Sequence, residues 1–245
     1  MIIESMLRSF PQRSIKVWIS LVFVSCIVFV FYHFSLKYAE PNFSYYIEAD
    51  NFLYDGLSIF SGISLPLFGP NAGLPVLINF CLGPLLAYQI AIAMKLVGLT
   101  PINIWYVLIT FNLIGIISLF FVLNKLIGIK RSILCTMLLI SAPALYQVQA
   151  AYFHHVQYAL PYIIGLTCAL CWFNMIGGKA TWYLAVLFFS LAVHFHVTAY
   201  VLVVPLLMVA LVNRHSFSFQ SILFSLFIFF VCNYYIATFH KQMHH

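Results

Sequence analysis

The hydrophobic residues of this chain form long continuous runs that are separated by short polar stretches. The first run covers about 17–36. The later runs lie near 76–97, 101–123, 132–150, 157–176, 180–195, 197–212 and 217–237. Apolar and polar residues do not alternate with a period of two, so the runs predict helices rather than strands. A transmembrane helix needs roughly 20 predominantly apolar residues, and most of the runs approach that length.

The composition places these helices in a membrane. The chain is 64% hydrophobic and only 7% charged, whereas a soluble domain carries about 25% charged residues. A soluble fold of this size cannot cover so much apolar surface. A backbone in lipid must satisfy its hydrogen bonds within helices or a closed barrel. The sequence therefore predicts an all-α, polytopic transmembrane helical bundle.

The distribution of lysine and arginine predicts how the chain crosses the membrane. The run at 76–97 is ambiguous because it contains Asn79, Gln89 and Lys95. If this run lies on the outer face as a juxtamembrane helix, eight of the 11 basic residues lie inside; if it crosses, only five do. Because cytoplasmic loops are enriched in Lys and Arg, the first arrangement is favoured.

This arrangement predicts a single transmembrane domain over 1–245 with about seven spans. The first span covers 17–36, an outer loop with juxtamembrane helices covers 37–100, and six further spans occupy 101–237. The N-terminus is then cytoplasmic and the C-terminus outside. The first span follows basic residues and has no small-residue cleavage site after it, so it is expected to be an uncleaved signal anchor. We expect a multi-pass protein of the bacterial inner (plasma) membrane.

The five carboxylates are distributed very unevenly. Four of them, Glu40, Glu48, Asp50 and Asp55, lie within sixteen residues of the outer loop, and none follows Asp55. Carboxylates at a membrane face are costly unless they are solvated or paired, so the cluster suggests a functional site. An outer loop must also be polar to stay in water, and this simpler interpretation remains open.

A helix over the acidic cluster would organise its side chains. In such a helix Asp50, Tyr54 and Leu57 share one stripe, while Glu48 and Asp55 lie on another. Asp50 is expected at or near the N-cap, where the helix dipole favours the ionised carboxylate. An ionised carboxylate at the membrane surface is suited to act as general base toward a hydroxyl acceptor.

Several short motifs follow one another in a characteristic order. They are Asp50, Tyr54 and Gly62; Gly83-Pro84-Leu85 leading to Leu96-Val97-Gly98; Asn124-Lys125 before Gly128; Ser141-Ala142-Pro143; and the stretch 191–200 leading to Val204-Pro205. In this order and spacing the chain resembles the GT-C superfamily of membrane glycosyltransferases, which includes protein O-mannosyltransferases and bacterial aminoarabinose transferases. The resemblance extends over nearly the whole chain, and the shared module of that superfamily has seven spans.

The resemblance implies transfer of a sugar from a polyprenyl-phosphate donor to an acceptor at the outer face. Asp50 would be the general base, with Glu48 as the second choice, and Tyr54 and Asp55 would contribute to substrate binding. The leaving group is a lipid phosphate, so cationic groups should meet it. The candidates at the outer face are Lys95, His154, His155, His194 and His196.

Each candidate also has a simpler structural interpretation. Lys95 can extend to the headgroups, and Tyr54 can belong to the interfacial aromatic belt. His154 and His155 can be interfacial residues at the end of a span. His194 and His196 are two residues apart, so they point in different directions on a helix and more readily form hydrogen bonds at a helix turn than a shared metal site.

We expect no cofactor, although a divalent metal is conceivable. Members of the superfamily often carry a second acid in the outer loop near 150–157, and this chain has none there. The expected partners are the lipid-linked donor and membrane lipids. Because family members are usually longer, a partner subunit that supplies missing spans is also conceivable. Basic residues form no cluster beside aromatic ones, so nucleic acid is not expected.

Two other functions stay open beside the transferase. A non-catalytic membrane subunit, or a truncated inactive fragment, would explain a chain shorter than its presumed relatives. A transporter or flippase-like protein usually places ionisable residues near the middle of its spans. The apolar runs here contain no acid after Asp55, which disfavours ion coupling.

Overall fold

The computed structural model describes residues 12–39, 47–63, 84–143, 145–146, 155–195 and 197–242. Within these ranges the regular structure is entirely helical, as the apolar runs predict. The α-helices are α2 (Gln12–Ala39), α3 (Ile47–Phe60), α4 (Leu85–Val97), α5 (Pro101–Ile127), α6 (Ile129–Ile140), α8 (His155–Ile176), α9 (Lys179–Val193), α10 (Val203–Val212) and α11 (Phe219–Gln242). Two short 3-10 helices, η2 (Val197–Leu202) and η3 (Arg214–Ser216), precede and follow α10.

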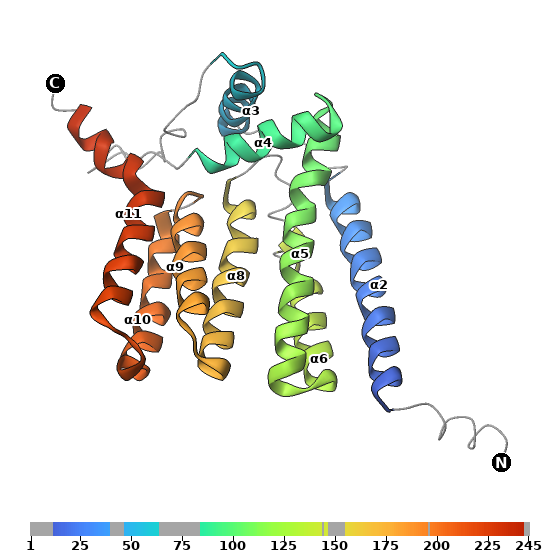
Figure 1. Cartoon of the computed structure of the whole chain (residues 1–245). Helices are drawn as coiled ribbons and strands as arrows, with labels where there is room; N and C mark the ends of the chain where they lie inside the picture. The colour runs from blue at the N-terminus through green and yellow to red at the C-terminus, as the bar shows by residue number, and fades with distance from the viewer. Residues whose placement is uncertain are drawn as a thin grey trace.

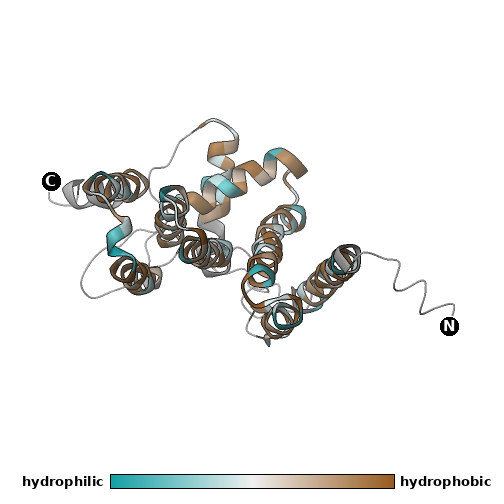
Figure 2. Cartoon of the chain, turned by 60° about the horizontal axis from the view of Figure 1, so that its bottom comes forward, coloured by the Kyte–Doolittle hydropathy of each residue, from teal (hydrophilic) through white to brown (hydrophobic). Residues whose placement is uncertain are grey.

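The helices form an upright bundle and a smaller unit across one of its ends. In Figure 1, helices α2, α5, α6, α8, α9, α10 and α11 run up and down, whereas α4 lies across their upper ends with α3 above it. Hydrophobic residues cover most of the upright helices, and polar residues are more frequent on α3 and α4 (Figure 2). We call α3 and α4 together the platform.

Three of the upright helices are long and apolar enough to cross a membrane. These candidate spans are Lys16–Lys37, Pro101–Ile127 and Tyr158–Ile176. Shorter apolar helices lie at Leu85–Val97, Lys179–Val193, Ala199–Val212 and Phe219–Asn233. Helix α6 has 12 residues, which at 1.5 Å per residue is about 18 Å and shorter than the membrane core.

The turns at the lower end of the bundle are tight and basic. The α5–α6, α8–α9 and α10–α11 connections lie at this end, where α2 also begins (Figure 1). Gly128, Gly177 and Gly178 have positive φ angles of 80°, 73° and 100° at two of these turns, a conformation that glycine adopts without strain. The basic residues at these turns and at the start of α2 are Arg13, Lys16, Lys125, Lys130, Arg131, Lys179 and Arg214. We call this the basic end.

Glycines allow the central helices to pack closely. A Cβ atom at Gly115 of α5 would lie 3.3 Å from the Cα of Pro161 in α8. A Cβ atom at Gly165 of α8 would lie 2.8 Å from the ring of Phe188 in α9. Small residues at helix crossings are a common means of association in membranes, where the hydrophobic effect does not drive helices together. These contacts position α8 between α5 and α9.

The first helix joins the bundle through aromatic and hydroxyl contacts. The Tyr32 hydroxyl lies 2.7 Å from the Thr110 hydroxyl of α5, and the rings of Phe23 and Phe120 are 4.9 Å apart. Other side chains of α2 are exposed, Phe29 at 71% and Trp18 at 64%. An apolar helix with this much exposed surface is expected to face lipid.

Candidate functional site

Helix α3 is held against α4 by a close crossing. Phe52 is only 1% exposed. A Cβ atom at Gly56 would lie 2.6 Å from the Cγ2 of Ile90 and 3.3 Å from the Ala87 carbonyl oxygen in α4. No side chain larger than glycine fits at position 56 unless the two helices move apart. The platform is therefore a packed pair, in which α4 determines the position of the acidic helix.

The described carboxylates all lie on α3. Helix α3 begins at Ile47, so Glu48 and Asp50 lie in its first turn. This position agrees with the expectation that Asp50 lies near the start of a helix. The side chains of Glu48 and Asp50 lie outside the described residues.

The side of α3 that carries Tyr54 faces away from α4. Tyr54 is 71% exposed and Leu57 is also exposed, whereas Phe52 and Gly56 face α4. This exposed side of α3 is not covered by α4.

Asp55 lies between the two faces of α3. It is partly buried, and this burial raises the pKa of its carboxyl above the ordinary value of 3.8 by removing water. The protonated form of Asp55 is thus favoured more than in an exposed aspartate. A partly buried carboxyl beside an open helix face is suited to hydrogen bonding with a hydroxyl-rich ligand.

Helix α4 is tied to the bundle by a polar contact that the sequence did not point to. The Gln89 amide nitrogen donates a hydrogen bond to the Tyr162 hydroxyl of α8. The Tyr162 ring stacks on Phe195 with the ring centroids 5.1 Å apart. These two residues were not among the predicted site residues. The only available signal was a glutamine within an apolar run, which also fits an unpartnered interfacial side chain.

The residues predicted to supply cationic groups differ in their exposure. Lys95 is exposed in the last turn of α4. His194 follows the end of α9 and is buried, and its Nε2 donates to the Cys232 carbonyl oxygen of α11 at 2.7 Å. This agrees with the simpler prediction of a hydrogen bond at a helix turn. His155 begins α8, and its side chain, like His154 and His196, lies outside the described residues.

Chain direction brings these candidates to the platform end. Helix α8 begins at this end, and α9 finishes there next to η2 (Figure 1). The start of α8 and the end of α9 therefore lie on the same side of the bundle as α3 and α4. Among the residues that the structure describes, no three His, Cys, Asp or Glu side chains are grouped to hold a metal ion.

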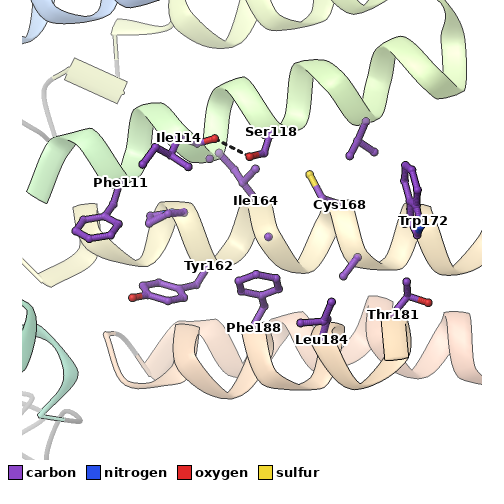
Figure 3. Close-up of a pocket in the computed structure, with 15 residues that line it drawn as sticks. Phe111, Ile114, Ser118, Tyr162, Ile164, Cys168, Trp172, Thr181, Leu184 and Phe188 are labelled. Carbon is purple, nitrogen blue, oxygen red and sulfur yellow. Dashed lines mark hydrogen bonds between the residues drawn. The ribbon is translucent and has the colours of Figure 1, made fainter. Parts of the chain in front are cut away.

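An apolar cavity of about 540 Å³ lies between α5, α8 and α9. Figure 3 shows Phe111 and Tyr162 at one end of it and Trp172 and Thr181 at the other. Since α8 runs from the platform to the basic end, Tyr162 is at the platform side. Lys125 lies 5.7 Å from the centroid of the Trp172 ring at the basic side. We call this cavity the central groove.

The central groove is connected to the platform through one side chain. Tyr162 lines the groove and accepts the hydrogen bond from Gln89 of α4. The platform end of the groove therefore lies next to α4. No family model, curated protein or solved structure matches this chain.

Proposed function

We propose that this chain is a membrane glycosyltransferase that moves a sugar from a polyprenyl-phosphate donor to an acceptor at the platform. The observation that carries the proposal is that all acidic residues whose backbone the structure describes lie on α3. This helix is held over the end of an apolar bundle. If a hydroxyl acceptor from water reacts with a donor held in lipid, the general base must lie at the membrane face, and a carboxylate on α3 meets this requirement.

In this proposal Asp50 is the general base. The acceptor oxygen attacks the anomeric carbon, the bond from that carbon to the phosphate oxygen breaks, and the lipid phosphate leaves with the electron pair. Asp50 takes the acceptor proton, with Glu48 as the alternative base. Tyr54 and Asp55 contact the sugar or the acceptor, since both lie on or beside the open side of α3.

Cationic groups at the platform would stabilise the departing phosphate. Lys95 at the end of α4 is exposed and suited to this role. His154 and His155 at the start of α8 are further candidates. His194 is proposed instead as a positioning residue, because its ring is buried and bonded to α11.

The central groove supports the lipid-linked character of the donor. Its walls are apolar, it runs along the spans, and it reaches the platform at Tyr162. An isoprenoid chain in this groove would leave its phosphate below α4. A soluble nucleotide-sugar donor would gain nothing from such a groove, since it has no apolar chain to bury.

We further propose that α2, α5, α6, α8, α9, α10 and α11 are seven membrane spans, with the platform outside and the basic end in the cytoplasm of a bacterium. Lys and Arg at the turns of one end support this orientation through the positive-inside rule. The shorter helices α6, α9 and α10 would then cross a locally thinned or protein-lined region.

The proposal is tested by comparing envelope glycans and glycolipids. Wild type and Asp50→Asn are expressed at equal membrane abundance in a strain without the gene, and extracts are analysed by mass spectrometry. The matched control is Glu4→Gln, which changes a carboxylate that precedes the first apolar run. A sugar-sized mass difference that appears with wild type and Glu4→Gln but not with Asp50→Asn supports the transferase.

The same experiment separates the other candidate functions. A product that persists in both Asp50→Asn and the Asp50→Asn, Glu48→Gln double variant excludes the general-base role. Identical profiles for wild type and the empty strain contradict a transferase active on its own and favour a non-catalytic subunit.

A further inference from the structure

A second groove lies between α10 and α11 on the outside of the bundle. Helices α10 and α11 both pack on α9, and a cavity of about 510 Å³ lies between them. We call it the peripheral groove. Its volume is within the roughly 300–1,000 Å³ of typical ligand pockets. It is separate from the central groove, and its residues take no part in the proposed transfer of sugar.

The walls of the peripheral groove are apolar along most of its length. The described residues that line it come from α9, α10, η3 and α11, and most of them are aliphatic or aromatic. The Trp182 indole nitrogen donates to the Ser225 hydroxyl at 2.8 Å, so these two polar groups satisfy each other. Arg214 is the one charged residue in this described lining.

Arg214 stands at the mouth of the groove at the basic end. It begins η3, in the connection between α10 and α11, and it is exposed. Its Nε donates to the His215 ring at 3.4 Å, a contact that does not use the two terminal nitrogens. Those terminal nitrogens form the pair that can bind two phosphate oxygens at once.

Aromatic rings cluster at the same end of the groove as Arg214. Trp182 and Phe217 are 4.6 Å apart between centroids, and Phe173 is 5.6 Å from each of them. Tryptophan rings gather at the depth of lipid headgroups. The groove therefore changes from aromatic and cationic at the basic end to purely aliphatic and phenyl-lined toward its middle.

We propose that the peripheral groove binds an anionic glycerophospholipid of the leaflet at the basic end. An acyl chain occupies the space between α10 and α11, and the phosphate lies against Arg214. The complementarity of charge selects the anionic lipid over a zwitterionic one, because basic pockets between transmembrane helices bind anionic headgroups. The bound lipid completes the contact between α10 and α11 by filling the groove.

Brominated lipids test this site, because bromine on an acyl chain quenches a tryptophan that it touches. The full chain is reconstituted in phosphatidylcholine vesicles that contain a small fraction of brominated phosphatidylglycerol or brominated phosphatidylcholine. Subtracting the tryptophan fluorescence of the Trp182→Phe variant from that of wild type gives the fluorescence of Trp182 alone. We expect about five-fold stronger quenching of Trp182 by the anionic lipid at equal mole fraction, from the attraction of one arginine near the surface.

Two charge variants test which residue gives the preference for phosphatidylglycerol over phosphatidylcholine. Arg214→Gln should remove the preference for phosphatidylglycerol, and Lys179→Gln should keep it, since Lys179 lies at the same end on α9 but does not line the groove. Equal quenching by both lipids in wild type would overturn the proposal, and this result needs no variant. An equal loss of the preference for phosphatidylglycerol in Lys179→Gln would overturn the role of Arg214, because it would assign the preference to general surface charge. Absence of Trp182 quenching by either lipid would overturn the proposal, because it would show that no acyl chain enters the groove.

Discussion

The platform and the basic end differ in how they present charge. The acids of the platform lie on one amphipathic helix, α3, which is packed on α4 through Gly56. The cations of the basic end are spread over separate short turns, and two of these turns contain glycines with positive φ. A packed helix holds its side chains in fixed relative positions, as catalysis requires. The dispersed Lys and Arg residues of the basic end instead follow the pattern that the positive-inside rule describes for cytoplasmic loops.

The largest expected effect is on the chemistry proposed for the platform. Asp50→Asn keeps the size of the side chain and removes its basicity, so the rate of sugar transfer should fall by about 10²–10⁴-fold. Quantitative mass spectrometry of the product at equal protein level provides the rate. A tenfold or smaller decrease would mean that Asp50 orients the acceptor without accepting its proton.

The next largest effect concerns the packing that holds the acids in place. Gly56→Leu forces a side chain into Ile90 and Ala87, and overpacking of this kind costs about 1–3 kcal/mol. Hydrogen exchange of the α3 backbone should accelerate by roughly ten-fold or more. Leu57→Met is the matched control, because Leu57 is exposed on the other side of α3. Unchanged exchange in Gly56→Leu would contradict the close crossing.

A smaller effect is expected at the link between platform and bundle. Gln89→Leu removes the donor to Tyr162, and hydrogen bonds between membrane helices contribute about 0.6 kcal/mol on average. Exchange of α4 should rise about two- to three-fold, with α9 unaffected. Adding Tyr162→Phe to Gln89→Leu should cause little further change, since the two side chains share one bond. Additive effects would show that they act separately.

The smallest effect is a dependence of platform packing on pH. Burial raises the pKa of Asp55 in the packed platform, so packing favours the protonated carboxyl. Its contribution is fully present below the ordinary value of 3.8 and is lost as pH rises through the raised pKa. Hydrogen exchange of α3, corrected for intrinsic rates, should therefore show weaker protection at neutral pH. Asp55→Asn should remove this dependence, and an unchanged profile in Asp55→Asn would assign it to another group.

The helical nature and many helix positions could be predicted from the apolar runs alone. Helix α5 covers the run predicted at 101–123, and α8 covers that at 157–176, because continuous apolar segments of this length are stable only as helices in lipid. Helix α6 ends at Ile140, before the end of the apolar run predicted at 132–150. Ser141, Ala142 and Pro143 follow, and the residue before a proline is disfavoured in helical conformation.

The sequence by itself determined that this protein is helical and apolar, that four of its five acids lie within sixteen residues after the first apolar run, and that its cations lie mainly between the apolar runs. These properties are local, because they depend on the composition and order of neighbouring residues. Only the tertiary structure decided that Gly56 meets Ile90, that Gln89 reaches Tyr162, and that Arg214 stands at the mouth of an apolar groove. Such contacts join residues far apart in the chain, and they follow from how whole helices pack.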